Sequence, residues 1–140
     1  MGIFSKLKEI FSGKSIESLK EFEPEIKKLQ KKSNSEIVAL IGTDGRLKGL
    51  PLIYAAIIED NIRRYTAQLT ELMGPLKKVD DKKEIRYIFI RYENSILFYK
   101  PIMKNISFFA ITPNKSSIST FQHWIEDKTD ILREVFHSEL

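Results

Sequence analysis

The stretch Ser35–Pro51, SEIVALIGTDGRLKGLP, decides the fold. Its first part, Ile37–Ile41, is a continuous run of mostly β-favouring apolar residues that is too short for a buried helix. Thr43–Gly45 supplies turn chemistry, because Asp can bond its own backbone and Gly accepts positive φ. Arg46–Pro51 is predicted to return as a shorter strand. Continuous apolarity, rather than alternation, indicates a strand that is covered on both faces of a sheet.

Residues 1–14 precede this hairpin as a predicted amphipathic helix, and residues 15–140 are expected to form one domain. The apolar side chains of the first segment recur at helical spacing, with lysines and serines largely off that face. So short a helix needs a surface to lie on in water. The alternatives are its own domain, a partner protein, or a membrane with anionic headgroups. The residues assigned to membrane or partner docking are Ile3, Phe4, Leu7, Ile10 and Phe11.

Two short helices are predicted between this segment and the first strand. The first ends near Phe22 and the second runs from Pro24 to Lys32, because proline fits best in the first turn of a helix. The second helix carries a lysine cluster, which usually forms a solvated face. Phosphate binding is the alternative interpretation. The cluster is Lys27, Lys28, Lys31 and Lys32.

The longest helix is predicted from Leu52 or Tyr54 to Met73, where Gly74–Pro75 would end it. Its apolar stripe should cover the sheet, and its polar residues should face water. The stripe consists of Ile58, Ile62, Tyr65, Leu69 and Leu72.

Three strands and a helix are predicted to complete the chain. The expected ranges are Glu84–Tyr92, Ser95–Tyr99 and Ile106–Thr112 for the strands, and Ser116 or Ser117 to Phe136 for the helix. Short connections between these strands indicate antiparallel pairing.

The fold class follows from this order of elements. Helix, two strands, helix, three strands and helix, after the N-terminal helical extension, give an α+β fold with a five-stranded antiparallel sheet. Because the long strands are apolar on both faces, helices must cover both, which makes a three-layer α/β/α sandwich.

Composition excludes several classes of function. The chain has no cysteine, so it has no disulfide framework and no thiolate nucleophile or metal site. Its net charge is +4 and most of that excess lies in the first quarter of the chain, so no nucleic-acid partner is expected. No window is apolar enough to span a membrane, and no secretory signal is apparent, so a cytoplasmic setting is expected.

No active site is visible in the sequence. The two histidines, His123 and His137, lack the spacing of metal ligands and have no serine nucleophile motif near them. We therefore expect a protein that is not an enzyme and that has no cofactor or metal.

The layout around IVALIGTDGRLKGLP resembles the roadblock (dynein light-chain) family. In that family an apolar strand, a turn and a short second strand precede a long helix, and Ser35–Phe136 matches this order. Longin domains have a related fold, but two helices typically follow their last strand. The resemblance implies a non-catalytic protein that dimerises with a copy of itself or with a related roadblock protein.

The resemblance also implies which residues act. Roadblock domains pair the long helix and the third strand with those of a second copy, and many regulate Ras-like small GTPases, some by stimulating GTP hydrolysis. The dimer-interface residues implied here are Ile85, Tyr87, Phe89, Arg91, Ala56, Arg63 and Ala67. The implied GTPase-binding residues are Asp60, Asn61, Arg64, Gln68 and Glu71.

One alternative function is a membrane-tethering adaptor in which the N-terminal helix binds lipid, so that the protein is peripheral at the membrane. A longin-like trafficking domain is another. Independently of any family, an exposed strand as apolar as Glu84–Tyr92 would be prone to aggregation, which pairing with a second copy removes.

Overall fold

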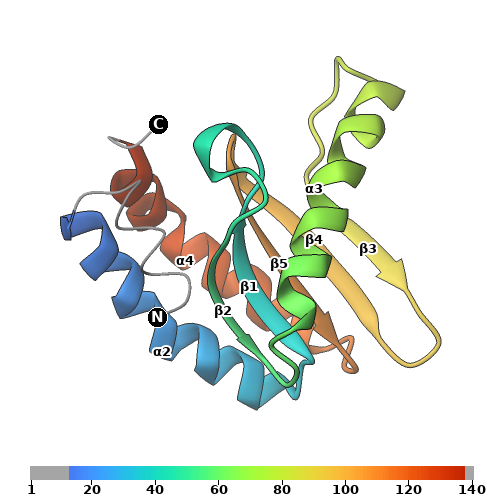
Figure 1. The fold of residues 1–140 in the computed structure, drawn as a ribbon. Helices are drawn as coiled ribbons and strands as arrows, with labels where there is room; N and C mark the ends of the chain where they lie inside the picture. The colour runs from blue at the N-terminus through green and yellow to red at the C-terminus, as the bar shows by residue number, and fades with distance from the viewer. Residues whose placement is uncertain (1–12, 138–140) are drawn as a thin grey trace.

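The computed structural model describes residues 13–137 and contains a five-stranded antiparallel sheet of order β2–β1–β5–β4–β3 (Figure 1). The strands are β1 Ile37–Gly42, β2 Pro51–Ala56, β3 Ile88–Arg91, β4 Ile96–Met103 and β5 Ile106–Thr112. The helices are α2 Gly13–Ser33, α3 Asn61–Val79 and α4 Ser117–His137, and Gly45–Leu47 forms the short 3-10 helix η1. Helices α2 and α4 cover one face and α3 covers the other, which confirms the three-layer α+β sandwich.

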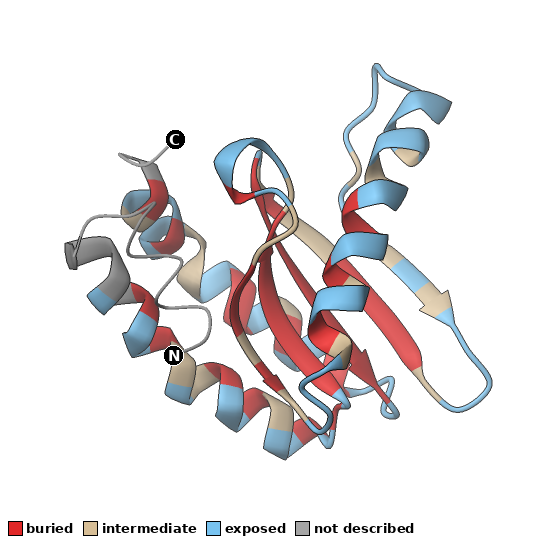
Figure 2. Ribbon diagram, viewed as in Figure 1, coloured by how far each residue is buried: buried red, intermediate tan, exposed pale blue. Residues whose placement is uncertain are grey.

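Strands β1 and β5 are buried along their whole length (Figure 2). In β1, Val38 and Leu40 belong to the core beneath α2 and α4, whereas Ile37, Ala39 and Ile41 belong to the core beneath α3. The continuous apolar run therefore does report a strand that is covered on both faces. Within residues 13–137, no helix is long and apolar enough to cross a membrane.

The second strand was predicted at Arg46–Pro51, and this is wrong. The chain first makes η1, which buries Leu47, and β2 begins only at Pro51. Proline suits the first position of an edge strand because it has no N–H to donate. The loop is compact because the Gly42 N–H donates to the carbonyl of Leu50 (2.7 Å) and the Gly49 N–H donates to the carbonyl of Gly42 (2.9 Å).

The long helix begins later and ends later than predicted. Residues 51–56 pair with β1, so α3 starts at Asn61, and Ile58 lies exposed in the preceding loop. The helix also continues through Gly74 and Pro75, which are both exposed. Water can there solvate the carbonyl that Pro75 leaves without an intrahelical donor.

Helix α2 is likewise continuous through Pro24, where two helices were predicted. Pro24 lies on the exposed side of the helix, so its missing N–H does not leave a buried carbonyl unpaired. The helix ends at Ser33, followed by Asn34 with a left-handed φ of 54°. Asn is one of the residues that tolerate this conformation at a helix end.

Strand β3 is shorter than the predicted Glu84–Tyr92, and β4 is longer than the predicted Ser95–Tyr99. Strand β4 runs through Pro101 and pairs with β5 along most of its length. Extension of the β3–β4 register would place Arg86 opposite Pro101 in a hydrogen-bonded pair. Proline has no N–H for that bond, so β3 begins only at Ile88.

Candidate functional site

Among residues 13–137, strand β3 is the open edge of the sheet. The other edge strand, β2, lies against α2 and is buried at four of its six positions. By contrast, β3 is exposed or half-buried at all four of its positions. A sheet edge exposes unpaired N–H and C=O groups, which can pair with a strand of another chain.

The β3–β4 ladder determines which backbone groups of β3 point outward. The N–H of Tyr92 donates to the carbonyl of Ser95 at 2.8 Å, so these two residues form a hydrogen-bonded pair. Such pairs alternate along an antiparallel ladder, so Ile90 and Ile88 also bond to β4. The N–H and C=O groups of Phe89 and Arg91 therefore point away from the sheet, toward solvent.

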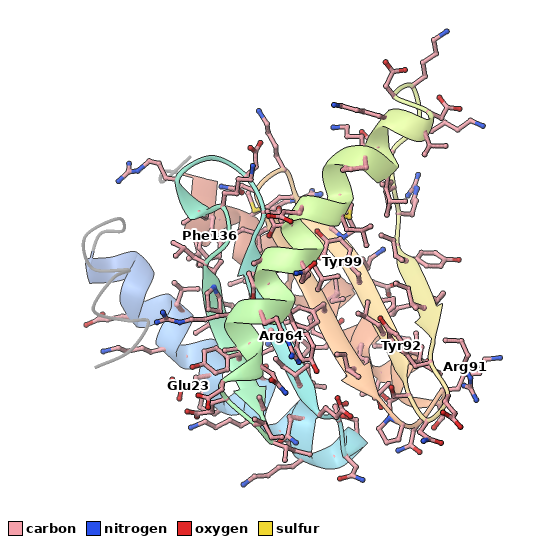
Figure 3. All side chains as sticks on the ribbon, turned by 45° about the vertical axis from the view of Figure 1, so that its right-hand side comes forward. Glu23, Arg64, Arg91, Tyr92, Tyr99 and Phe136 are labelled. Carbon is pink, nitrogen blue, oxygen red and sulfur yellow. The ribbon has the colours of Figure 1, made fainter. Side chains whose placement is uncertain are left out.

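The same edge carries exposed aromatic side chains. Tyr87, Phe89 and Tyr92 are 49, 47 and 49 % exposed. The rings of Tyr87 and Phe89 are 4.9 Å apart, and Phe89 contacts Phe98 of β4 at 5.3 Å. Arg91 projects from the free side of the sheet (Figure 3). Of the implied interface residues, Tyr87, Phe89 and Arg91 thus lie together, with Tyr87 just before the strand.

Ile85 is half-buried and also precedes β3, in the segment predicted to be part of that strand. On the opposite face of β3, Ile88 and Ile90 pack partly against the core beneath α3. The edge therefore has an aromatic face on the α2–α4 side and an aliphatic face on the α3 side.

The residues assigned to GTPase binding lie at the start and on the outer face of α3. Asp60 precedes the helix and makes no side-chain capping bond, and Asn61 is its first residue. Arg64, Gln68 and Glu71 are exposed. The Arg64 guanidinium lies 5.2 Å from the centre of the Tyr65 ring, an attractive cation–π geometry.

The three interface residues assigned to the long helix do not share one position in the fold. Ala56 is not on the helix at all but ends β2, the strand farthest from β3. Arg63 and Ala67 are exposed on α3. Burial raises the pKa of Tyr54 in β2 above its ordinary value; the charge of Glu59 raises this pKa further and that of Arg63 lowers it.

The flank of α3 toward β4 and β3 carries other residues. The Tyr65 ring contacts Phe109 of β5 at 6.3 Å, which identifies the side of the helix that faces this half of the sheet. Gln68 and Leu72 follow Tyr65 at helical spacing. Leu72 is 37 % exposed. The sequence pattern placed Leu72 in the covered stripe, so its exposure was not foreseen.

Ile3, Phe4, Leu7, Ile10 and Phe11 lie outside the described residues. Within residues 13–137, no three His, Cys, Asp or Glu side chains lie close enough together to hold a metal ion.

Known proteins are similar to this chain in their structure but not in their sequence. No family model matches the sequence, and no curated protein matches it either. Among solved structures, Myxococcus xanthus MglB is similar with a TM-score of 0.67 and 17 % identity, covering 87 % of this chain and 92 % of that one. An MglB with tetrameric arrangement has a TM-score of 0.69 at 9 % identity, covering 94 % and 96 %.

The Roadblock/LC7 domain from Streptomyces avermitilis is also similar, with a TM-score of 0.55 and 12 % identity over 70 % of this chain and 85 % of that domain. The TM-scores are above 0.5 over 70 % or more of each chain, which shows a shared fold. The chain therefore has the fold of a roadblock domain.

Proposed function

We propose that this protein is a dimeric, non-catalytic scaffold that binds and regulates a Ras-like small GTPase. The observation that carries the proposal is the open β3 edge beside the exposed flank of α3. Burying the exposed Phe89 ring and pairing its outward backbone groups both favour association. A structurally similar MglB is described with a tetrameric arrangement, so self-association occurs in proteins of this fold.

The outward groups of β3 select a register for a symmetric dimer. If two β3 strands pair antiparallel with Phe89 on the two-fold axis, Phe89 faces its own copy. Ile88 then faces the partner's Ile90, and Tyr87 faces the partner's Arg91. Each pair is favourable, since aromatic, aliphatic and cation–π pairs all stabilise neighbouring strands.

In this dimer the outer faces of the two α3 helices lie on the same side of the joined sheet. Arg64, Gln68 and Glu71 from both copies then form one polar platform, with Asp60 and Asn61 at the start of each helix. A GTPase presents charged, mobile switch segments, and mixed charges on the platform suit such a partner. The GTPase assignment follows from the roadblock resemblance.

Dimerisation is tested by light scattering on the full chain. Phe89→Pro removes an outward N–H without removing a β3–β4 hydrogen bond, so we expect a folded monomer. Phe89→Asp places two carboxylates across the axis and should give the same result. Phe89→Val keeps the N–H and should remain dimeric. A monomeric wild type, or a dimeric Phe89→Pro protein with wild-type affinity, would overturn the β3 interface.

GTPase binding is tested by interferometry with a Ras-like GTPase of the same organism, loaded with GDP or with a GTP analogue. We expect binding that depends on the nucleotide and that Arg64→Ala with Glu71→Ala weakens. Lys83→Ala, outside the platform, is the matched control. Nucleotide-independent binding, or equal loss in the control, contradicts the regulatory role while leaving the dimer intact.

A further inference from the structure

Two neighbouring isoleucines lie exposed in the loop that joins β2 to α3 (Figure 2). Ile57 is 63 % exposed and Ile58 is 59 % exposed. Among the large apolar side chains that the structure describes, only Val79 is more exposed. We propose that this isoleucine pair is an apolar anchor that binds the small GTPase at the end of the polar platform on α3. The inference rests on the function proposed above and adds to it the contact that supplies apolar burial.

Backbone hydrogen bonds hold the loop in place at both of its ends. The Ile57 N–H donates to the carbonyl of Glu36 at 2.9 Å, which continues the pairing of β1 with β2 beyond Ala56. The Asn61 N–H donates to the carbonyl of Ile58 at 3.3 Å, which connects the loop to the start of α3. Side chains on a fixed loop lose less conformational freedom on binding, so the isoleucine pair is preorganised for a partner.

Charged residues of both signs flank the isoleucine pair. Glu59 and Asp60 follow Ile58 directly, and Arg63 and Arg64 lie in the first turn of α3. None of these four side chains forms an ion pair with another residue in the range 13–137. An apolar centre with a polar rim is typical of a protein–protein interface. Two carboxylates beside the pair disfavour an anionic membrane surface, so a protein partner fits better.

The size and position of the pair favour the GTPase over a second copy of this chain. A stable interface covers roughly 800 Å² on each partner, and two side chains supply only a small part of that area. A partner that covers them must therefore also cover adjacent surface, which includes Arg64 on the platform. The loop follows β2, at the border of the sheet farthest from β3. A second copy that pairs with β3 would leave the loop uncovered.

The test is interferometry with the full chain and a Ras-like GTPase of the same organism, loaded with a GTP analogue. The double variant Ile57→Ser with Ile58→Ser should weaken binding by about tenfold or more, which corresponds to about 1.4 kcal/mol. Because both side chains are exposed and serine suits a loop, the double variant should keep the thermal stability of wild type.

Ile131→Ser is the matched control, since Ile131 is 46 % exposed on α4, which covers the other face of the sheet from α3. This change should alter the affinity for the GTPase by less than about twofold. An equal loss in Ile131→Ser and in each single variant, Ile57→Ser and Ile58→Ser, would reflect a general loss of apolar surface and overturn the anchor.

Failure of the anchor can be distinguished from failure of the proposed function. If Arg64→Ala with Glu71→Ala weakens GTPase binding while the double isoleucine variant binds like wild type, the anchor is wrong and the platform stands. If wild type binds the GTPase in neither nucleotide state, both are wrong.

Two other occupants of the loop are checked with the same proteins. A lower mass of the double isoleucine variant than of wild type in light scattering would assign the pair to self-association. Sedimentation of wild type with phosphatidylserine vesicles, lost in the double variant, would assign the pair to a membrane. Either result overturns the GTPase anchor.

Discussion

Gly42 at the end of β1 is predicted to tolerate no side chain. A Cβ built on Gly42 would lie 2.0 Å from the carbonyl oxygen of Leu47 and 2.7 Å from its Cβ. Both atoms belong to the η1 loop and neither is the end of a flexible side chain. Alanine at position 42 must therefore displace the loop backbone by about an ångström before it reaches ordinary contact distance.

The cost of Gly42→Ala can be bounded from the structure. Overpacking of this kind costs about 1–3 kcal/mol. Leu47 is 2 % exposed, and displacing it forfeits part of the roughly 1.5–3 kcal/mol that its burial contributes. Replacing a strand glycine by alanine reduces the entropy lost on folding, which stabilises the folded state by at most about 1 kcal/mol. We expect a net loss of about 2–4 kcal/mol in the free energy of unfolding.

Gly74→Ala is the matched control, because this helical glycine is exposed and no atom lies within 4 Å of its built Cβ. Alanine should stabilise α3 by about 0.5–1 kcal/mol. Urea denaturation of wild type and both variants, at one protein concentration, measures the two effects. The reasoning fails if Gly42→Ala stays within about 0.5 kcal/mol of wild type, or if both substitutions change stability in the same direction.

Three further outcomes are expected. Burial raises the pKa of Tyr99 above 10.0, although its hydrogen bond to Ser107 (2.9 Å) opposes this shift. The folded state therefore keeps the phenol proton at a pH where the unfolded chain loses it, so stability falls as the pH rises through this range. Denaturation at pH 9–11 should show a smaller decline in stability for Tyr99→Phe than for wild type. Leu132 is 0 % exposed, so Leu132→Ala should lower the free energy of unfolding by about 2–5 kcal/mol. Its neighbour Ile131 is 46 % exposed, and Ile131→Ala should lower it by less than about 1 kcal/mol. Equal losses would contradict the burial of this side of α4. The Lys128–Glu25 ion pair (3.0 Å) is partly exposed, so a double-mutant cycle should give a coupling below about 1 kcal/mol.

The central strands could be predicted because nearly all of their residues are apolar. Ile37–Ile41 and Ile106–Thr112 are apolar at nearly every position, and only a doubly covered strand accounts for this in so short a run. The structure has both within one residue of the expected limits.

The second strand could not be predicted because its environment overrides its local preference. Residues 52–58, LIYAAII, contain alanines and lead directly into a helical pattern, so the sequence predicts a helix that begins at Leu52 or Tyr54. Pairing with β1 and packing beneath α2 stabilise residues 51–56 as a strand instead.

The candidate site could likewise be predicted only in part from the sequence. The apolar edge around Phe89 was visible as a sequence pattern, and it does lie at the open edge. Which flank of α3 faces that edge depends on how the helix crosses the sheet, and sequence spacing does not contain this information. That is why the exposure of Leu72, which the apolar stripe assigned to the covered face, could not be predicted.

The asymmetry between the two borders of the sheet limits how large an assembly can grow. A sheet with two free borders can add strands at both ends and lengthen into a fibril. Here β2 is buried at four of its six positions and β3 at none, so in the proposed dimer the more exposed border of each copy is the one that pairs. In the proposed dimer the joined sheet would have ten strands with β2 at both borders, so no β3 border would be left for a further chain to pair with.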